Sequence, residues 1–250
     1  TKLFGGGPME GTFRLASRSD LWGAEVGAWR NLDRDENSSW DLLLGLRNLN
    51  LEEEVDVRYA SRQDLPGAAF GAFAQDRFST VSRFYGLQVG SRFRLDEGPW
   101  SLNLLGKVGL GAMVRTVRID GNGGAFDELD PDVPAATDYG VFALPGNIGT
   151  HTDVGFAVVP EVRLSFGYQV TRRLRVTVGY DFLYASGAAR AADQIDTEVQ
   201  TSGAIPAGFS RTLDDYLRFI GPTGTTSADD DVRESGFWTH GLDVGVELAF

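Results

Sequence analysis

The sequence predicts an all-β protein, a transmembrane antiparallel up-and-down β-barrel. Three observations predict it: apolar and polar residues alternate with a period of two along seven segments, most segments are unusually long, and the connections alternate between short and long. A strand that crosses a bilayer needs about 9–11 residues, whereas a strand of a globular protein has about 5–6. Long segments with one apolar face therefore suit a wall that crosses a membrane.

The alternation is clearest at the C-terminus. From Trp238 to Phe250 the even positions are apolar apart from His240, and the odd positions are small or charged over most of their length. The strand that starts at Trp40 loses its phase near Asn48, which predicts a β-bulge there. The predicted strands span residues 20–32, 40–47, 85–95, 100–115, 160–170, 174–184 and 237–250, and residues 11–17 are a candidate eighth strand.

The connections between consecutive strands alternate regularly in length. Three are short and three are long: residues 33–39, 96–99 and 171–173 form the short set, and residues 61–80, 118–153 and 186–235 form the long set. Outer-membrane barrels combine short periplasmic turns with long extracellular loops. We therefore expect the long connections outside the cell and the C-terminus on the periplasmic side.

The ionic face of each predicted strand is expected to line the lumen. Small residues fill many of its positions, and six acids against seven bases leave it nearly neutral, as a low-dielectric interior requires. The predicted lumen charge network comprises Glu25, Arg47, Arg92, Lys107, Arg115, Glu161, Arg163, Arg175, Asp181, Asp243 and Glu247; Asp41 and Arg94 complete the count. A filled, hydrogen-bonded interior and a narrow charged pore are both compatible with this set.

Aromatic residues lie toward the strand ends on the apolar face, which predicts interfacial girdles facing lipid. The predicted girdle residues are Trp22, Trp40, Trp100, Tyr168, Tyr184, Trp238 and Phe250, with His240 on the same face. The alternative interpretation is a soluble β-barrel binding protein, in which these residues would belong to the core.

Composition excludes several classes of protein. The chain of 250 residues has 42% hydrophobic residues, no Cys and a net charge of −12, and it contains no apolar run of transmembrane-helix length. Disulfides and thiolate metal sites are therefore excluded, and nucleic acid is not expected as a partner. Residues 118–153 carry −6 and residues 186–235 carry −5 of the net charge, so we expect acidic extracellular loops that could contact protein partners or other copies.

Catalysis and metal binding have little support in the sequence. His151 and Asp153 could form a rim site with Asp193 and Asp196, but no nucleophile, phosphate-loop or cofactor motif accompanies them. We therefore predict neither an enzyme nor a cofactor. Weak calcium candidates are Asp127, Glu128, Asp130 and Asp132; they lack EF-hand spacing, and solvated acids are the simpler interpretation.

Several short motifs are spread along the chain, in residues 17–25 (SRSDLWGAE), 43–53 (LLGLRNLNLEE), 83–90, 106–111, 144–161, 178–184, 193–196 and 237–242. Together these motifs resemble an uncharacterised outer-membrane β-barrel family abundant in planctomycetes. The resemblance implies a bacterial outer-membrane location, contact with outer-membrane lipid, and a terminal Phe250 read by the barrel-insertion machinery. It implies no established activity beyond porin-like.

The resemblance also implies about three strands upstream of this region and ten in the intact barrel, an even number. Residues 1–16 are accordingly interpreted as an N-terminal segment at the end of a truncated extracellular loop, and residues 17–250 as the barrel domain. A structural or interaction role and a small-solute porin are the two functions expected for such a protein.

Overall fold

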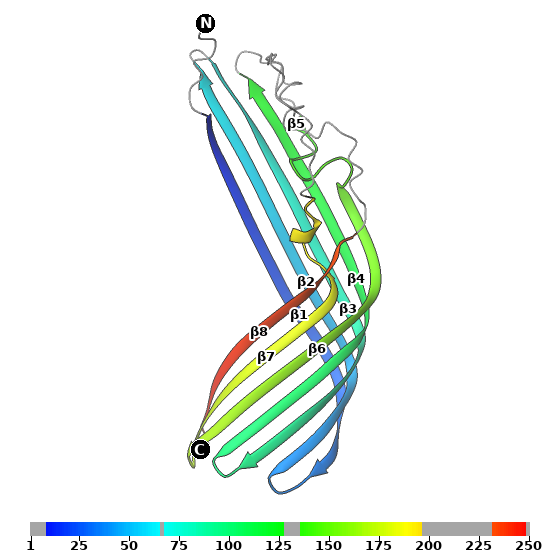
Figure 1. Cartoon of the computed structure of the whole chain (residues 1–250), viewed down its shortest axis with the longest axis vertical. Helices are drawn as coiled ribbons and strands as arrows, with labels where there is room; N and C mark the ends of the chain where they lie inside the picture. Colours follow the sequence, from blue (N-terminus) through cyan, green and yellow to red (C-terminus); the bar gives the residue numbers. More distant parts are fainter. Residues whose placement is uncertain (1–8, 66–67, 128–135, 197–231, 249–250) are drawn as a thin grey trace.

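One antiparallel sheet makes up most of the described chain. The structure is a computed structural model, and it describes residues 9–65, 68–127, 136–196 and 232–248. Seven long strands follow one another in chain order across the sheet (Figure 1): β1 (Met9–Arg34), β2 (Ser38–Leu65), β3 (Ala68–Glu97), β4 (Trp100–Asp127), β6 (Gly149–Thr171), β7 (Leu174–Ala189) and β8 (Glu234–Leu248). The prediction of an all-β, antiparallel up-and-down fold is confirmed.

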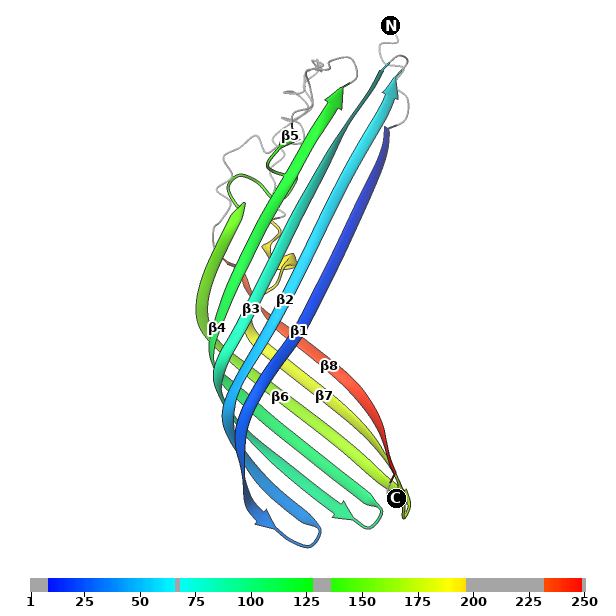
Figure 2. The same ribbon diagram turned by 180° about the vertical axis from the view of Figure 1, so that it is seen from behind.

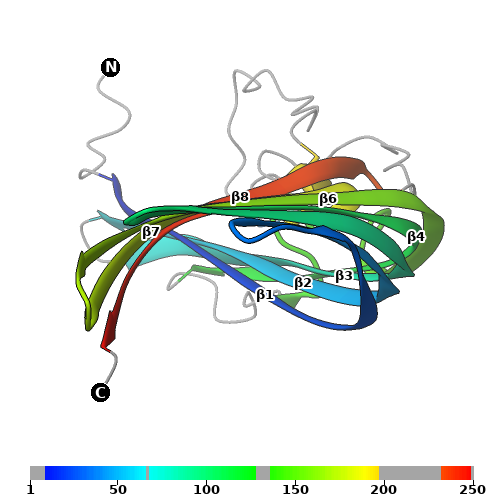
Figure 3. The same cartoon turned by 90° about the horizontal axis from the view of Figure 1, so that it is seen from below.

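The sheet bends along its length and curls across its width, like part of a barrel wall (Figures 2 and 3). β1 and β8 form its two edges, and neither has a second neighbour in the parts of the chain that the structure describes. The two-residue strand β5 (Ala136–Thr137) pairs with β4, and a short 3₁₀ helix, η1 (Ala192–Gln194), follows β7. Within the described ranges no helix is long and apolar enough to cross a membrane.

The first four strands are much longer than predicted, at 26 to 30 residues. Residues 61–80, predicted as a long connection, are mostly strand, because β2 continues to Leu65 and β3 begins at Ala68. Likewise β4 and β6 take residues from both ends of the predicted connection 118–153. Residues 11–17 do not form an eighth strand; they continue β1, paired with the upper part of β2.

The predicted bulge near Asn48 is wrong. β2 keeps a continuous register with both neighbours through this residue. What changes there is the face that carries the apolar side chains: Leu44 faces outward and is 61% exposed, whereas Leu49 faces inward and is 6% exposed. An unbroken strand whose apolar side switches faces produces the same slip of phase in the sequence as a bulge does.

Buried side chains fill the inner face of the curled sheet in two clusters. The upper cluster is made of Val55, Val57, Phe78, Val117, Ile119, Ala143, Ala189 and Ala191. The lower cluster is made of Leu49, Phe84, Met113, Ala157, Val159 and Ala185. The strands supply most of both clusters, and the segments that follow β5 and β7 fold inward to complete the upper one.

Glycine allows the lower cluster to lie flat on the sheet. A Cβ placed on Gly86 would overlap the ring of Phe84, and one on Gly109 would lie 3.1 Å from the same ring. The aromatic ring therefore occupies the space that two side chains would otherwise fill. An aromatic side chain that covers glycine in this way is a recurrent means of stabilising curved sheets.

Candidate functional site

The outer face of the sheet carries a broad apolar band. Leu164, Val178 and Val246 point outward there and are 43%, 51% and 62% exposed. Inward-facing neighbours such as Ala157 and Val159 are buried. Large apolar side chains that form a continuous band on the outside of a curled sheet suit a non-aqueous surrounding.

The predicted girdle residues lie on the same outer face. Trp22, Trp40, Trp100, Tyr168 and Trp238 are exposed, Tyr184 is half-buried, and Phe250 lies outside the described residues. The ring centroids of Trp100 and Tyr168 are 4.4 Å apart. His240 is also on this face, with its ring stacked 5.6 Å from that of Trp238. Pairs of aromatic rings thus mark both ends of the band.

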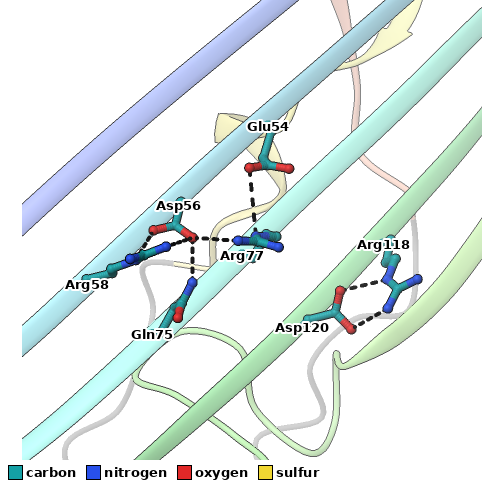
Figure 4. A network of polar contacts seen from close by, with 7 residues as sticks. All are labelled: Glu54, Asp56, Arg58, Gln75, Arg77, Arg118 and Asp120. Atoms are coloured by element: carbon teal, nitrogen blue, oxygen red, sulfur yellow. Dashed lines mark hydrogen bonds and ion pairs between the residues drawn. The ribbon is translucent and has the colours of Figure 1, made fainter.

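Above the band, toward the β2–β3 connection, the outer face becomes charged (Figure 4). This outer charged wall contains Glu54, Asp56, Arg58, Gln75, Arg77, Arg118 and Asp120. At its centre Asp56 accepts hydrogen bonds from Arg58 at 2.7 Å and from Gln75 at 2.6 Å. Burial acts to raise the pKa of Asp56, but the hydrogen bonds from Arg58 and Gln75 and the nearby charges outweigh burial and lower it.

The distribution of apolar and charged side chains between the two faces therefore changes at one level of the sheet. Below this level the outer face is apolar and the inner face is ionic, and above it the outer face carries a charged network and the inner face carries the upper apolar cluster together with a few buried charges such as Arg115 and Asp76. Water on the outside demands the upper pattern and lipid demands the lower one. The level runs between Leu46 and Asn50 on β2 and between Tyr85 and Arg83 on β3.

Four of the predicted lumen residues meet on the inner face, each from a different strand. Lys107 Nζ lies 2.9 Å from a carboxylate oxygen of Glu25 and 2.9 Å from one of Glu161. Arg47 approaches the other oxygen of Glu161 at 2.6 Å. This Lys107 cluster joins β1, β2, β4 and β6, and its two bases balance its two acids. A buried ionic group needs such pairing, since an unpaired charge there is costly.

Nearer the end of the sheet with the short β1–β2, β3–β4 and β6–β7 connections, the inner face carries separate pairs. Asp41 binds Arg92 at 3.1 Å and Arg94 at 3.4 Å. Arg163 binds Asp181 on the neighbouring strand. Arg175 pairs with Asp96 at 3.3 Å, a partner that was not predicted because the sequence placed Asp96 in a short connection, whereas it lies near the end of β3. Asp243 and Glu247 lie on the inner face of β8, in register with Gly179 and Arg175 of β7.

Arg115 is the most deeply buried charge of the predicted network, with a fully buried side chain. It binds Asp153 and Glu234, the latter at 2.8 Å, and donates to the carbonyl oxygen of Gly187. Neither acid was predicted for the lumen, because both residues were placed in long connections. Arg115 thus ties the start of β6, the end of β7 and the start of β8 to β4.

A segment after β5 folds against the inner face of β3; residues 140–148 are called the inner strap. The carboxylate of Asp76 accepts hydrogen bonds from the backbone N–H groups of Val141, Phe142 and Ala143, at 3.1, 3.2 and 2.8 Å. Burial raises the pKa of Asp76, and the three N–H donors oppose that rise without cancelling it. Asp76 was not identified from the sequence, since it lies in a stretch predicted as loop.

The residues considered for catalysis are not brought together as a catalytic pair. Asp153 binds Arg115, and His151 Nε2 lies 3.3 Å from the carbonyl oxygen of Asn147. Asp193 and Asp196 lie near Arg233, which bonds the carbonyl oxygen of Asp193 at 3.3 Å.

The calcium candidates lie at the edge of the described chain. Asp127 ends β4, and Glu128, Asp130 and Asp132 lie outside the described residues. Where residues are described, no group of three or more His, Asp or Glu side chains is arranged to hold a metal ion.

A single curled antiparallel sheet, apolar outside and ionic inside over one band, defines a wall of the outer-membrane β-barrel class. The particular family follows from comparison with known sequences. The chain belongs to the family described as Putative beta barrel porin-7 (BBP7), whose profile matches residues 5–250. This description suggests a porin-like, non-enzymatic protein. None of the curated proteins matches the chain.

Proposed function

We propose that the protein is an integral bacterial outer-membrane barrel with a filled interior, and that it acts mainly as a structural or interaction protein. The membrane location is supported by the change of the outer face from the apolar band to the outer charged wall. Lipid would surround the band from Trp40 to Leu46 on β2, and the longer strands would continue above it into the extracellular space.

The filled inner face favours a structural role over an open pore. Phe84, Met113 and Arg115 are buried half-way up the inner face. Side chains that line a water-filled channel would instead be exposed to water. Above them the inner strap and the segment after β7 cover the wall. The extracellular part then offers two contact surfaces for protein partners or other copies: the outer charged wall and the acidic connections.

Ion conductance in planar bilayers tests this proposal directly. The protein reconstituted alone should give no regular ion-sized steps, because its interior is occupied. Steps of uniform size in the native protein would contradict the filled interior and support the second candidate, a small-solute porin. The second candidate is favoured by the family description and by the ionic lower interior around the Lys107 cluster.

Partition between phases separates both candidates from a soluble binding protein. We expect the protein to require detergent and to fractionate with outer membranes, because the apolar band is exposed over several strands. A protein that stays monomeric in water without detergent would contradict the membrane location.

A further inference from the structure

The inner strap is a compact unit with its own internal bonds. Asn147 accepts a hydrogen bond from the N–H of Leu144 at 2.7 Å and donates one to the carbonyl oxygen of Phe142 at 3.0 Å. Gly140 N–H also bonds the carbonyl oxygen of Ala143 at 2.8 Å. The strap therefore keeps a defined shape that presents three consecutive N–H groups to one side.

The strap covers the apolar upper part of the inner face. Phe142 and Ile148 pack against the upper cluster, which includes Val57 and Phe78 of the wall. Without the strap this apolar surface would face the interior of the barrel, where water would meet it unfavourably. Burial of the surface explains why the strap lies inside, but burial alone is non-directional and does not fix where the strap sits.

Asp76 supplies the directional contact. Its side chain is buried on β3, both carboxylate oxygens are used, and all of its hydrogen bonds described above go to backbone N–H groups of the strap. The fit is close, since a Cβ placed on Gly140 would overlap the Oδ1 atom of Asp76. A charged acceptor that takes three aligned N–H groups is a strong and specific contact.

We propose that Asp76 is a latch that holds the inner strap over the upper interior, and that release of the strap opens this part of the barrel. The inference rests on the proposed function, since a latch matters only if the native barrel is closed. The wall and the strap would then form a two-state device. The strap is folded inward while the carboxylate is engaged, and it is displaced when that contact is lost.

Two variants break the latch from opposite sides. Asp76→Ala removes the acceptor from the wall, and Gly140→Ala adds a methyl group on the strap that collides with the same carboxylate. Asp120→Ala on the outer charged wall is the control for loss of a carboxylate, and Gly106→Ala, where a Cβ meets nothing within 4 Å, is the control for an added methyl group.

Amide hydrogen exchange and conductance are measured on the reconstituted native protein and on all four variants. Both latch variants should exchange the amides of residues 141–143 about tenfold faster or more, and should show ion-sized steps; the controls should do neither. Unchanged exchange in both latch variants would overturn the latch. Faster exchange without conductance steps would overturn the claim that release of the strap opens the barrel. Steps in the native protein would instead count against the filled barrel, so the two failures are distinguishable.

Discussion

Substitution of Leu44 by Arg gives the sharpest test of the membrane-facing band. Leu44 points outward between Trp40 and Asn48, four residues from each. At about 3.4 Å per residue and a strand tilt of about 45°, it lies roughly 10 Å from the levels of Trp40 and Asn48, near the middle of the band. An arginine on the lipid face near the midplane costs about 2–4 kcal/mol.

The same substitution would cost little if water covered this face. Leu44 is 61% exposed, and exposed positions in water usually tolerate change within about 0.5 kcal/mol. Val81→Arg is the matched control, because Val81 faces outward above the band, beside Glu52 on β2 and Thr116 on β4. Placed there, the guanidinium stays in water and should alter stability by less than about 0.5 kcal/mol.

Equilibrium unfolding in denaturant, with the protein folded into lipid vesicles, measures both variants. We expect Leu44→Arg to lower the free energy of unfolding by about 2–4 kcal/mol and Val81→Arg to leave it nearly unchanged. Equal and small effects of the two substitutions would refute the assignment of lipid to the outer band.

Three further predictions concern the interior and the outer charged wall. Arg115→Ala should destabilise the protein by about 3 kcal/mol in the same unfolding assay, because it leaves two carboxylates without their base; a loss below about 1 kcal/mol would contradict the buried ionic link. Phe84→Ala should cost about 3–5 kcal/mol through the cavity it leaves, and a cost near that of a surface change would show that the lower cluster is not packed. The pKa of Asp56 is lowered in the folded state, so its contribution to stability is present above the ordinary pKa of about 3.9 and is lost as pH falls through the lower folded value. The difference in unfolding free energy between the native protein and Asp56→Asn should therefore shrink on acidification below about pH 4, and a difference that stays constant would count against the network.

The strands inside the band could be read from the sequence because one rule governs each residue there. Leu164 must face lipid and Arg163 must avoid it, so strict alternation survives in the amino-acid sequence. The same rule indicated which charges share the inner face. Above the band the rule weakens, since water on one side and a small core on the other tolerate residues such as Ser61, Ala72 and Ala74. Residues 61–80, which contain the end of β2 and the start of β3, were therefore predicted as a loop.

The contacts between charges could not be predicted from the sequence. Lys107 and Glu25 are 82 positions apart, and only the register of four strands brings them together. The acids that bind Arg115 come from segments whose strand character is weak in the sequence. The latch leaves no side-chain signature on the strap, because the donors to Asp76 are backbone N–H groups, which every residue except proline has.

The order of strands sets a condition on how the two edges of the sheet can be joined. Each of the seven long strands reverses the direction of the one before it, so β1 and β8 point the same way. A direct seam between them would be a parallel pair, with slanted hydrogen bonds between chains that are antiparallel everywhere else. A closed barrel in which all neighbouring strands are antiparallel needs an odd number of further strands between β8 and β1.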